Sequence, residues 1–206
     1  MCVLCCVALR CLLAAPGGRA AAQALPAATV PFAVGVSGGA AMRATGVGGA
    51  INLDAQLGAE VDLHPLGGWL PAVVGQVSRP VVRGSVAGER EALGGLRLAR
   101  SVLSGAAARQ RLVFGELMAG EGEIRYLGKG MAAAQPPYFY TLSHSVVWAA
   151  GGGLEQAVNV QRGAQRAVRV RVQLERWQTP VTASGHTFAA SVGVEWVWRP
   201  SLGGVR

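Results

Sequence analysis

The C-terminal segment, residues 186–198, reads HTFAASVGVEWVW and alternates in polarity along its whole length. Every second residue is apolar or aromatic: Phe188, Ala190, Val192, Val194, Trp196 and Trp198. The residues between them are mostly small or polar: Thr187, Ala189, Ser191, Gly193 and Glu195. Because successive side chains of a strand point to opposite faces, this period of two predicts a strand with one apolar face.

Comparable alternation recurs along the chain, and we count eight candidate strands. They span residues 30–43, 51–63, 69–83, 90–103, 110–127, 138–158, 167–176 and 186–198. The second and seventh are the most regular, whereas the pattern of the fourth also fits a short helix. Pro80 inside the third implies a bulge or an earlier end, and the sequence HPLGG at residues 64–68 predicts a turn.

The hydropathy of the chain suits strands that cross a membrane. Mean hydropathy is +0.34 and only 15% of the residues are charged. The sequence nevertheless contains no run of about eighteen uncharged apolar residues, so a spanning helix is not predicted. A membrane barrel dilutes its apolar residues by alternation, and in lipid its sheet must close so that every backbone group is paired. We therefore expect an all-β fold: an eight-stranded antiparallel up-and-down transmembrane β-barrel.

The first 24 residues are predicted to be a signal peptide, followed by a barrel domain over residues 25–206. The segment is apolar, is broken at Pro16, and ends in an A-x-A-like cleavage site at Ala22 to Ala24. A buried N-terminal helix is the alternative. All four cysteines lie within the first eleven residues, so the mature chain would contain no thiol.

The net charge of +8 does not indicate a nucleic-acid-binding protein. It is carried almost wholly by arginines, with Lys129 the only lysine. A nucleic-acid interface would need clustered basic residues with aromatics between them, whereas these arginines are scattered or alternate with acids. We therefore expect no nucleic-acid partner.

Four segments resemble the bacterial outer-membrane β-barrel domain family, which includes OmpA-type eight-stranded barrels and small porin-like proteins. They are residues 51–63, GGGLE at 151–155, AVRVRVQLERWQTP at 167–180 and HTFAASVGVEW at 186–196. The resemblance implies an outer-membrane location in a Gram-negative cell envelope, a structural or porin-like role, and contact with outer-membrane lipid.

The end of the last candidate strand resembles the signal by which the barrel insertion machinery recognises its substrates. The residues that carry the resemblance are Ser191, Gly193, Trp196 and Trp198. It implies the insertion machinery as a partner during biogenesis. The family usually ends on the aromatic residue, whereas here eight further residues follow.

On the barrel interpretation, the polar face of each strand lines a lumen that carries charges of both signs. We expect a lumen charge network of Asp54, Glu60, Glu121, Glu123, Arg125, Arg169, Arg171, Glu175 and Glu195. Unpaired buried charges are costly, so these groups should form ion pairs. A structural plug is favoured over a selective polar path, because eight strands enclose little more than their own side chains. In the fifth candidate strand Leu112, Phe114 and Met118 form the apolar face, which is expected to point outward, and Glu116 falls on that same face.

Aromatic residues are predicted to form two belts at the membrane interfaces. Phe32, Trp69, Trp196 and Trp198 would lie near the end that holds both termini. Tyr126, Tyr138, Tyr140 and Trp177 would lie near the opposite end. Trp177 is out of phase with the apolar face of its strand.

Two other classes of protein remain open on the sequence. A soluble periplasmic β-barrel or sandwich binding protein would show the same alternation with its faces exchanged. A lipid A-modifying enzyme would draw attention to His144 and Ser145, but neighbouring strand residues face opposite ways. We predict no catalytic residues, no cofactor site and no metal site, since no spacing of histidines or carboxylates suggests ligation.

Overall fold

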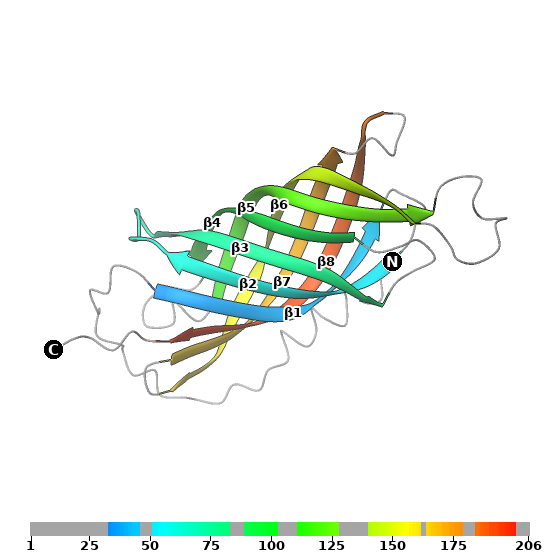
Figure 1. Cartoon of the computed structure of the whole chain (residues 1–206). Coiled ribbons are helices and arrows are strands. Elements are labelled where there is room, and N and C mark those ends of the chain that lie inside the picture. The colour runs from blue at the N-terminus through cyan, green and yellow to red at the C-terminus, as the bar shows by residue number, and fades with distance from the viewer. Residues whose placement is uncertain are drawn as a thin grey trace.

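Eight strands form one closed barrel in the computed structural model of the chain (Figure 1). The structure describes residues 33–45, 51–82, 89–102, 111–127, 140–161, 164–178 and 184–200. The strands are β1 (Ala33–Thr45), β2 (Ile51–Asp62), β3 (Trp69–Val82), β4 (Glu89–Ser101), β5 (Arg111–Leu127), β6 (Tyr140–Gln161), β7 (Ala164–Gln178) and β8 (His186–Pro200). Each pairs antiparallel with its neighbours in the chain, and β1 pairs with β8 to close the ring.

The predicted all-β fold with eight antiparallel strands in a closed barrel is confirmed. The fourth candidate segment, which also fitted a short helix, contains strand β4 over Glu89–Ser101. The predicted signal peptide, residues 1–24, lies outside the described residues. The described part of the chain contains no helix that is long and apolar enough to cross a membrane.

Two local predictions about strand ends are also confirmed. Leu66 pairs with Trp69 across Gly67 and Gly68, whose φ angles are 55° and 85°. Positive φ at both central residues is the requirement of the tight hairpin turn that matches strand twist. In β3, the register beside Pro80 shifts by one residue, which is a bulge where proline has no N–H to donate.

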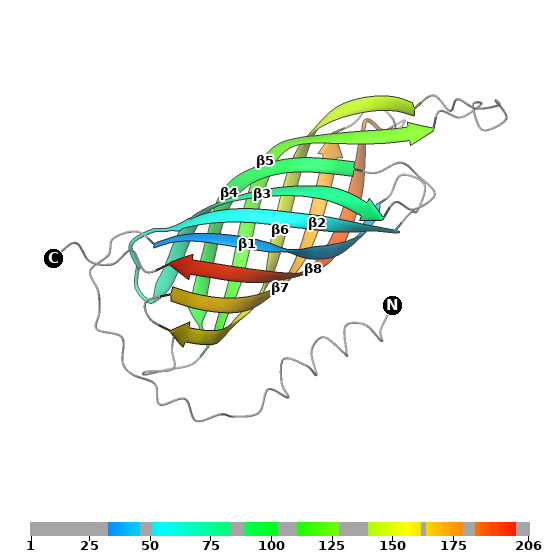
Figure 2. The same ribbon diagram turned by 60° about the horizontal axis from the view of Figure 1, so that its bottom comes forward.

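The barrel has two distinct ends. We call the end where β1 begins and β8 finishes the terminal end, and the opposite one the loop end. Strands β5 and β6 are the longest, with 17 and 22 residues. They reach beyond the other strands at the loop end (Figures 1 and 2).

Large apolar side chains cover the outside of the barrel. Leu57, Leu117 and Leu174 are 64%, 70% and 63% exposed. Burial alternates strictly along β8, with Trp196 and Trp198 outside and Glu195 inside. A soluble protein shows the reverse distribution, because water favours charged groups at its surface.

The inner face is not uniformly polar, because apolar side chains line part of it. Two buried apolar clusters comprise Ala72, Val74, Leu93, Met118, Val147, Ala149, Trp177 and Ala189, and Ala99, Leu112 and Phe114. Leu112, Phe114 and Met118 were expected on the outer face of their strand, and that prediction is wrong. The inward direction of these side chains is shared with Glu116, which is also buried.

Close strand contacts at two glycines allow the sheet to curve. A Cβ atom at Gly39 would lie 2.1 Å from the carbonyl oxygen of Val194, at the seam between β1 and β8. A Cβ atom at Gly153 would lie 1.9 Å from the carbonyl oxygen of Val170 on β7. Both distances are far below van der Waals contact. Glycine at these positions lets neighbouring backbones approach at sharply coiled points of a closed sheet.

We expect Gly153→Ala to lower barrel stability by about 1–3 kcal/mol, the usual cost of forcing atoms into a packed site. Gly115→Ala is the matched control, since a Cβ atom there has its nearest neighbour at 3.9 Å. Urea titration of the refolded barrel, followed by the heat-dependent gel shift, measures the difference. Equal unfolding midpoints for the two variants would contradict this account of the glycine.

Candidate functional site in the barrel lumen

The lumen near the terminal end is organised around one carboxylate, that of Glu60 on β2. Arg97 on β4 and Arg169 on β7 each place a guanidinium nitrogen 2.6 Å from its Oε2 atom. Arg199 on β8 places another 2.5 Å from its Oε1 atom. Glu60 is 4% exposed, so three strands deliver cations to one buried anion.

Further ion pairs extend this arrangement through the lumen. Glu155 lies 2.8 Å from Arg169 and 2.6 Å from Arg199. Arg171 lies 2.8 Å from both Glu116 and Glu195. We call the buried members of this set the terminal-end network; they are Glu60, Arg97, Glu116, Glu155, Arg169, Arg171, Glu195 and Arg199. Four arginines meet four glutamates within it, and Asp62, which is 30% exposed, adds a fifth carboxylate 3.3 Å from Arg97 and 3.5 Å from Arg199.

A second group of charges lies nearer the loop end, around Arg43 on β1. Its guanidinium contacts Asp54 at 3.2 Å, Glu175 at 3.3 Å, and also the carboxylate of Glu91. These four residues are the loop-end cluster. The indole N–H of Trp177 donates to Glu175 at 2.9 Å, so a neutral donor from inside the barrel supports the same carboxylate.

Many of these contacts cross the lumen rather than follow the wall. Arg169 on β7 reaches Glu60 on β2, and Arg43 on β1 reaches Glu91 on β4. Arg171 on β7 also donates to Gln76 on β3. Bonds between strands that are not neighbours place side chains in the middle of the cross-section. This agrees with the small interior of an eight-stranded barrel.

The structure gathers six of the nine expected lumen charges inside the barrel. They are Asp54, Glu60, Arg169, Arg171, Glu175 and Glu195, each no more than 5% exposed. Glu121 is instead exposed on the outer wall, and Glu123 also points outward, where it binds Arg90 at 2.5 Å. The prediction that these two glutamates line the lumen is wrong. The side chain of Arg125 lies outside the described residues.

The error for β5 follows from how its two faces were weighed. Leu112, Phe114 and Met118 made one face look like the lipid-facing one, although Glu116 shares it. Among the described residues, that inner face meets the apolar wall of the lumen. A charged side chain in lipid costs more free energy than an apolar side chain in the lumen. The position of Glu116 was therefore the better indicator of which face of β5 points inward.

Several members of the lumen charge groups were missed by the sequence reasoning. They are Arg43, Glu91, Arg97, Glu116, Glu155 and Arg199, all buried. Arg199 is four residues after Glu195 on β8, so the alternation of the strand points both side chains inward. A longer last strand would therefore have found it. The sequence around Arg97 offers no comparable signal, since Arg90 and Arg100 on the same strand point outward and are exposed.

The expected aromatic belts are placed only in part. Trp69, Trp196 and Trp198 are 39%, 46% and 41% exposed on the outer wall near the terminal end. Trp177 is fully buried in the lumen, so its assignment to an outer belt is wrong. Trp177 is two residues from Glu175 on β7, so both side chains point inward. The sequence showed this, because Trp177 is out of phase with the apolar face of its strand.

The side chains of the other four residues of the expected belts lie outside the described residues. Phe32 and Tyr138 lie outside the described residues, as do the side chains of Tyr126 and Tyr140. Trp148 and Phe188, which were not assigned to a belt, are each 60% exposed on the outer wall. Both are cross-strand neighbours of Arg176 on β7.

The residues of the predicted insertion signal divide between the two faces of β8. Ser191 and Gly193 are buried inside, whereas Trp196 and Trp198 are exposed outside. His144 and Ser145 divide in the same way: His144 is exposed on the outer wall and Ser145 is buried. In the described part of the chain no three histidine, cysteine, aspartate or glutamate side chains are placed to hold a metal ion.

Comparison with known proteins finds likeness in fold only. No family model matches the sequence, and no curated protein matches it. The crystal structure of Neisserial surface protein A superposes with a TM-score of 0.52 at 10% identity, over 84% of this chain and 97% of that one. The N-terminal β-barrel domain of Pseudomonas aeruginosa OprF gives a TM-score of 0.38 at 10% identity, over 80% and 96% of the two chains. The chain therefore shares its class of fold, a closed eight-stranded barrel, with Neisserial surface protein A.

We expect Glu60→Gln to destabilise the barrel by about 3–5 kcal/mol, because removing one partner leaves buried charges uncompensated. Glu121→Gln is the matched control, and it should change stability by less than about 0.5 kcal/mol at an exposed site. The urea midpoint of each refolded variant gives the comparison. A Glu60→Gln midpoint equal to that of the control would show that the terminal-end network contributes little.

Proposed function

We propose that the chain is an integral outer-membrane β-barrel with a structural role, whose lumen is closed to ions by its own side chains. The observation that carries the proposal is the inverted polarity of the sheet. On β7, Val172 and Leu174 are exposed on the outer wall, whereas Arg169, Arg171 and Gln173, which occupy the opposite phase of the strand, are buried. Hydrocarbon around the barrel and a sealed lumen inside account for both at once.

The dimensions of the strands support membrane insertion. Each has 12 to 22 residues, and about ten tilted residues suffice to cross a bilayer core. Exposed tryptophans near the terminal end suit a membrane–water interface. The likeness in fold to a Neisserial surface protein supports the outer membrane as the location. Outer-membrane lipid, and the insertion machinery during biogenesis, are the partners that follow.

The two alternative classes fit the described residues less well. A soluble binding protein would expose Leu57, Leu117 and Leu174 to water while it sequestered its charges. A lipid A-modifying enzyme built on His144 and Ser145 would need both side chains on one face, but they point to opposite sides of the wall. The proposal is therefore of a structural role rather than an enzymatic one.

The closed lumen distinguishes a structural barrel from a small porin. An ion that passes along the axis would have to displace Arg169 from Glu60 and Arg171 from Glu116. Each such displacement separates a buried ion pair and is costly in a narrow, poorly hydrated interior. The terminal-end network thus acts as a plug.

We predict that Leu117→Arg prevents stable insertion, because an arginine that faces lipid near the bilayer midplane costs about 2–4 kcal/mol. Gln178→Arg, at an exposed site at the loop end of β7, is the control and should insert normally. Outer membranes washed in high salt and then tested for the heat-dependent gel shift report the inserted fraction. A Leu117→Arg protein that is folded and soluble would favour the periplasmic alternative.

In planar bilayers the purified wild-type barrel should show no regular conductance steps. The double variant Glu60→Ser and Arg169→Ser removes a pair that spans the lumen, and we expect conductance to appear in it. The heat-dependent gel shift of both proteins verifies that they are folded. Uniform open channels in the wild type would instead establish a porin-like role.

A further inference from the structure

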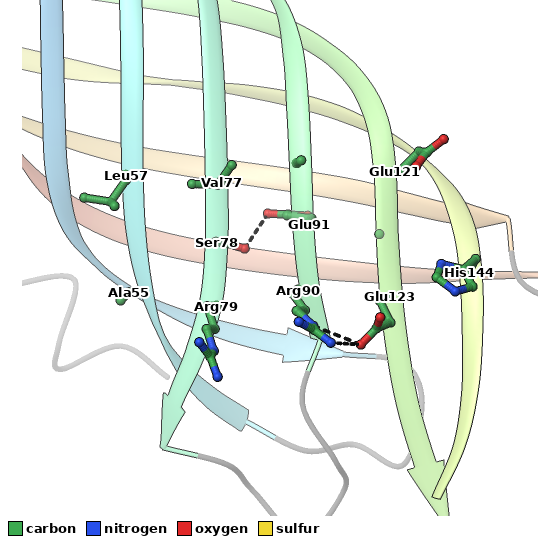
Figure 3. Close-up of a pocket in the computed structure, with 12 residues that line it drawn as sticks. Ala55, Leu57, Val77, Ser78, Arg79, Arg90, Glu91, Glu121, Glu123 and His144 are labelled. Atoms are coloured by element: carbon green, nitrogen blue, oxygen red, sulfur yellow. Dashed lines mark hydrogen bonds and ion pairs between the residues drawn. The ribbon is translucent and has the colours of Figure 1, made fainter.

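Two opposite charges on the outer wall near the loop end find no partner in their own barrel. Arg79 on β3 and Glu121 on β5 are both exposed, and neither has an ion-pair partner within the part of the chain that the structure describes. Both line one groove with a cavity volume of 580 Å³ on the outer wall, together with Val77 and Ala92 (Figure 3). Unpaired charges are costly on a wall that faces lipid, so an opposite charge from outside the barrel would stabilise each of them.

The rows of paired residues on the outer wall are not level but climb around the barrel. The path from Val34 on β1 returns to β1 at Ala44 after one full turn, and it passes through Val61, Val73, Leu96, Leu117, Ala150, Leu174 and Ala190. The path therefore shifts by ten residues toward the loop end. Such a shift over eight strands tilts the strands by about 40° from the barrel axis. Each step to the next strand, in the direction from β1 to β8, rises by about 3 Å toward the loop end.

This climb brings Arg79 and Glu121 to the same height on the barrel. By register, Glu121 lies in the row of Ala92 and Val77, which is two residues nearer the barrel middle than Arg79. Those two residues lower it by about 5 Å along the axis, whereas the two strand steps from β3 to β5 raise it by about 6 Å. The two charges therefore lie within about 1 Å of one level, and about 12 Å apart around the wall.

Small residues lie below and between the two charges. A line parallel to the barrel axis and midway between the charges runs toward the terminal end close to Ala92, Val77, Gly75 and Ala59. We call it the midline. Three of these four residues have no side chain beyond Cβ. Small residues let two membrane-embedded surfaces approach closely, so the midline is suited to contact with another protein surface.

We propose that this face is the interface of a homodimer, in which a second copy of the chain stands in the same orientation in the membrane. A two-fold axis along the membrane normal, placed at the midline, sets Arg79 of each copy against Glu121 of the other. Because the two charges share one level, both ion pairs form at once. Arg90 also lies near the axis, but Glu123 already neutralises it through contacts of 2.9 and 2.5 Å.

A lipid headgroup matches the two charges less well than a second copy does. A phosphate satisfies Arg79 but is repelled by Glu121 at the same level. A second copy supplies an anion and a cation at the same separation as the pair it meets. Chains that insert in the same direction are already in the orientation that the two-fold axis requires.

This inference rests on the proposed function, because the two charges are costly only if the outer wall faces lipid. The test is sedimentation equilibrium of the refolded full chain in density-matched detergent micelles, which gives the mass of the assembly and its dissociation constant. The wild type should form a dimer that dissociates on dilution. Urea titrations of dilute protein therefore report on the monomer, and Glu121→Gln remains a suitable control there.

Charge reversal tests the reciprocal pairing. Arg79→Glu and Glu121→Arg each set like charges against one another, so each should weaken dimerisation by about tenfold, the combined worth of two exposed ion pairs. An equal mixture of the two single variants should dimerise as the wild type does, because each copy then meets the opposite charges of the other. The double variant should recover for the same reason. Arg166→Glu, at an exposed arginine near the terminal end, is the control and should leave the dissociation constant unchanged.

Gly75→Leu tests the close approach at the midline. A Cβ atom at this position has its nearest neighbour in the barrel at 3.9 Å, so the variant should fold, which the heat-dependent gel shift reports. The added side chain projects from the outer wall and should weaken the dimer by about tenfold, as extra atoms forced into a packed contact do.

Three results would overturn the inference and leave the membrane barrel intact. They are a folded wild type that stays monomeric at high concentration, a dimer that both charge reversals leave unchanged, and a mixture of the two reversed variants that does not recover. A chain that fails to insert into membranes removes the proposed function as well, and the high-salt wash of outer membranes identifies that case.

Discussion

Three guanidinium groups converge on the carboxylate of Glu60, and the rest of the structure depends on how that contact is sheltered. Buried charged groups are stable only when they form ion pairs and hydrogen bonds that replace their contacts with water. The ring of eight strands provides the shelter, because each of its backbone groups can pair with a neighbouring strand and the inside is cut off from the outside. Once the charges occupy the interior, the residues that alternate with them along the same strands must face outward. The exposed leucines and valines of the outer wall and the ion pairs of the lumen are therefore two consequences of one alternation.

The lumen is not a uniformly charged tube. Apolar side chains such as Leu93, Met118 and Val147 line part of the wall, and the terminal-end network and the loop-end cluster lie in the same interior. The terminal-end network sets four arginines against four buried glutamates, with the partly exposed Asp62 beside them. The loop-end cluster sets one arginine against three carboxylates and draws on neutral donors such as Ser78 and Trp177. Both arrangements join strands that are not neighbours. They therefore tie the barrel together across its axis as well as around its circumference.

Much of this fold could be predicted from the sequence, since a period of two is a local property of each strand. The eight strands, the turn at Gly67 and Gly68 and the bulge beside Pro80 follow from such local patterns. The pattern does not say which face of a strand points inward, because alternation is unchanged when the faces are exchanged. In β7 the arginines indicated which face points inward. In β5 the prediction relied on three apolar residues rather than on Glu116, and it therefore placed Glu121 in the lumen instead of on the outer wall. Which charges meet could not be predicted, because Glu60 and Arg169 are brought together only by closure of the ring.

The central claim is that the outer wall faces hydrocarbon, and collision accessibility of spin labels tests it directly. The four cysteines are first replaced by serine, and single cysteines are then introduced at Val172 and Leu174 on the outer wall and at Gln173 in the lumen. Each carries a nitroxide label, and each labelled protein is placed in lipid vesicles. The account predicts that labels at Val172 and Leu174 collide with oxygen, which concentrates in lipid, and scarcely with a water-soluble nickel chelate. The label at Gln173, in the lumen, should collide less with oxygen than the two outer labels do, and it should also collide little with the nickel chelate. Ready access of the nickel chelate to Val172 and Leu174 would contradict the account.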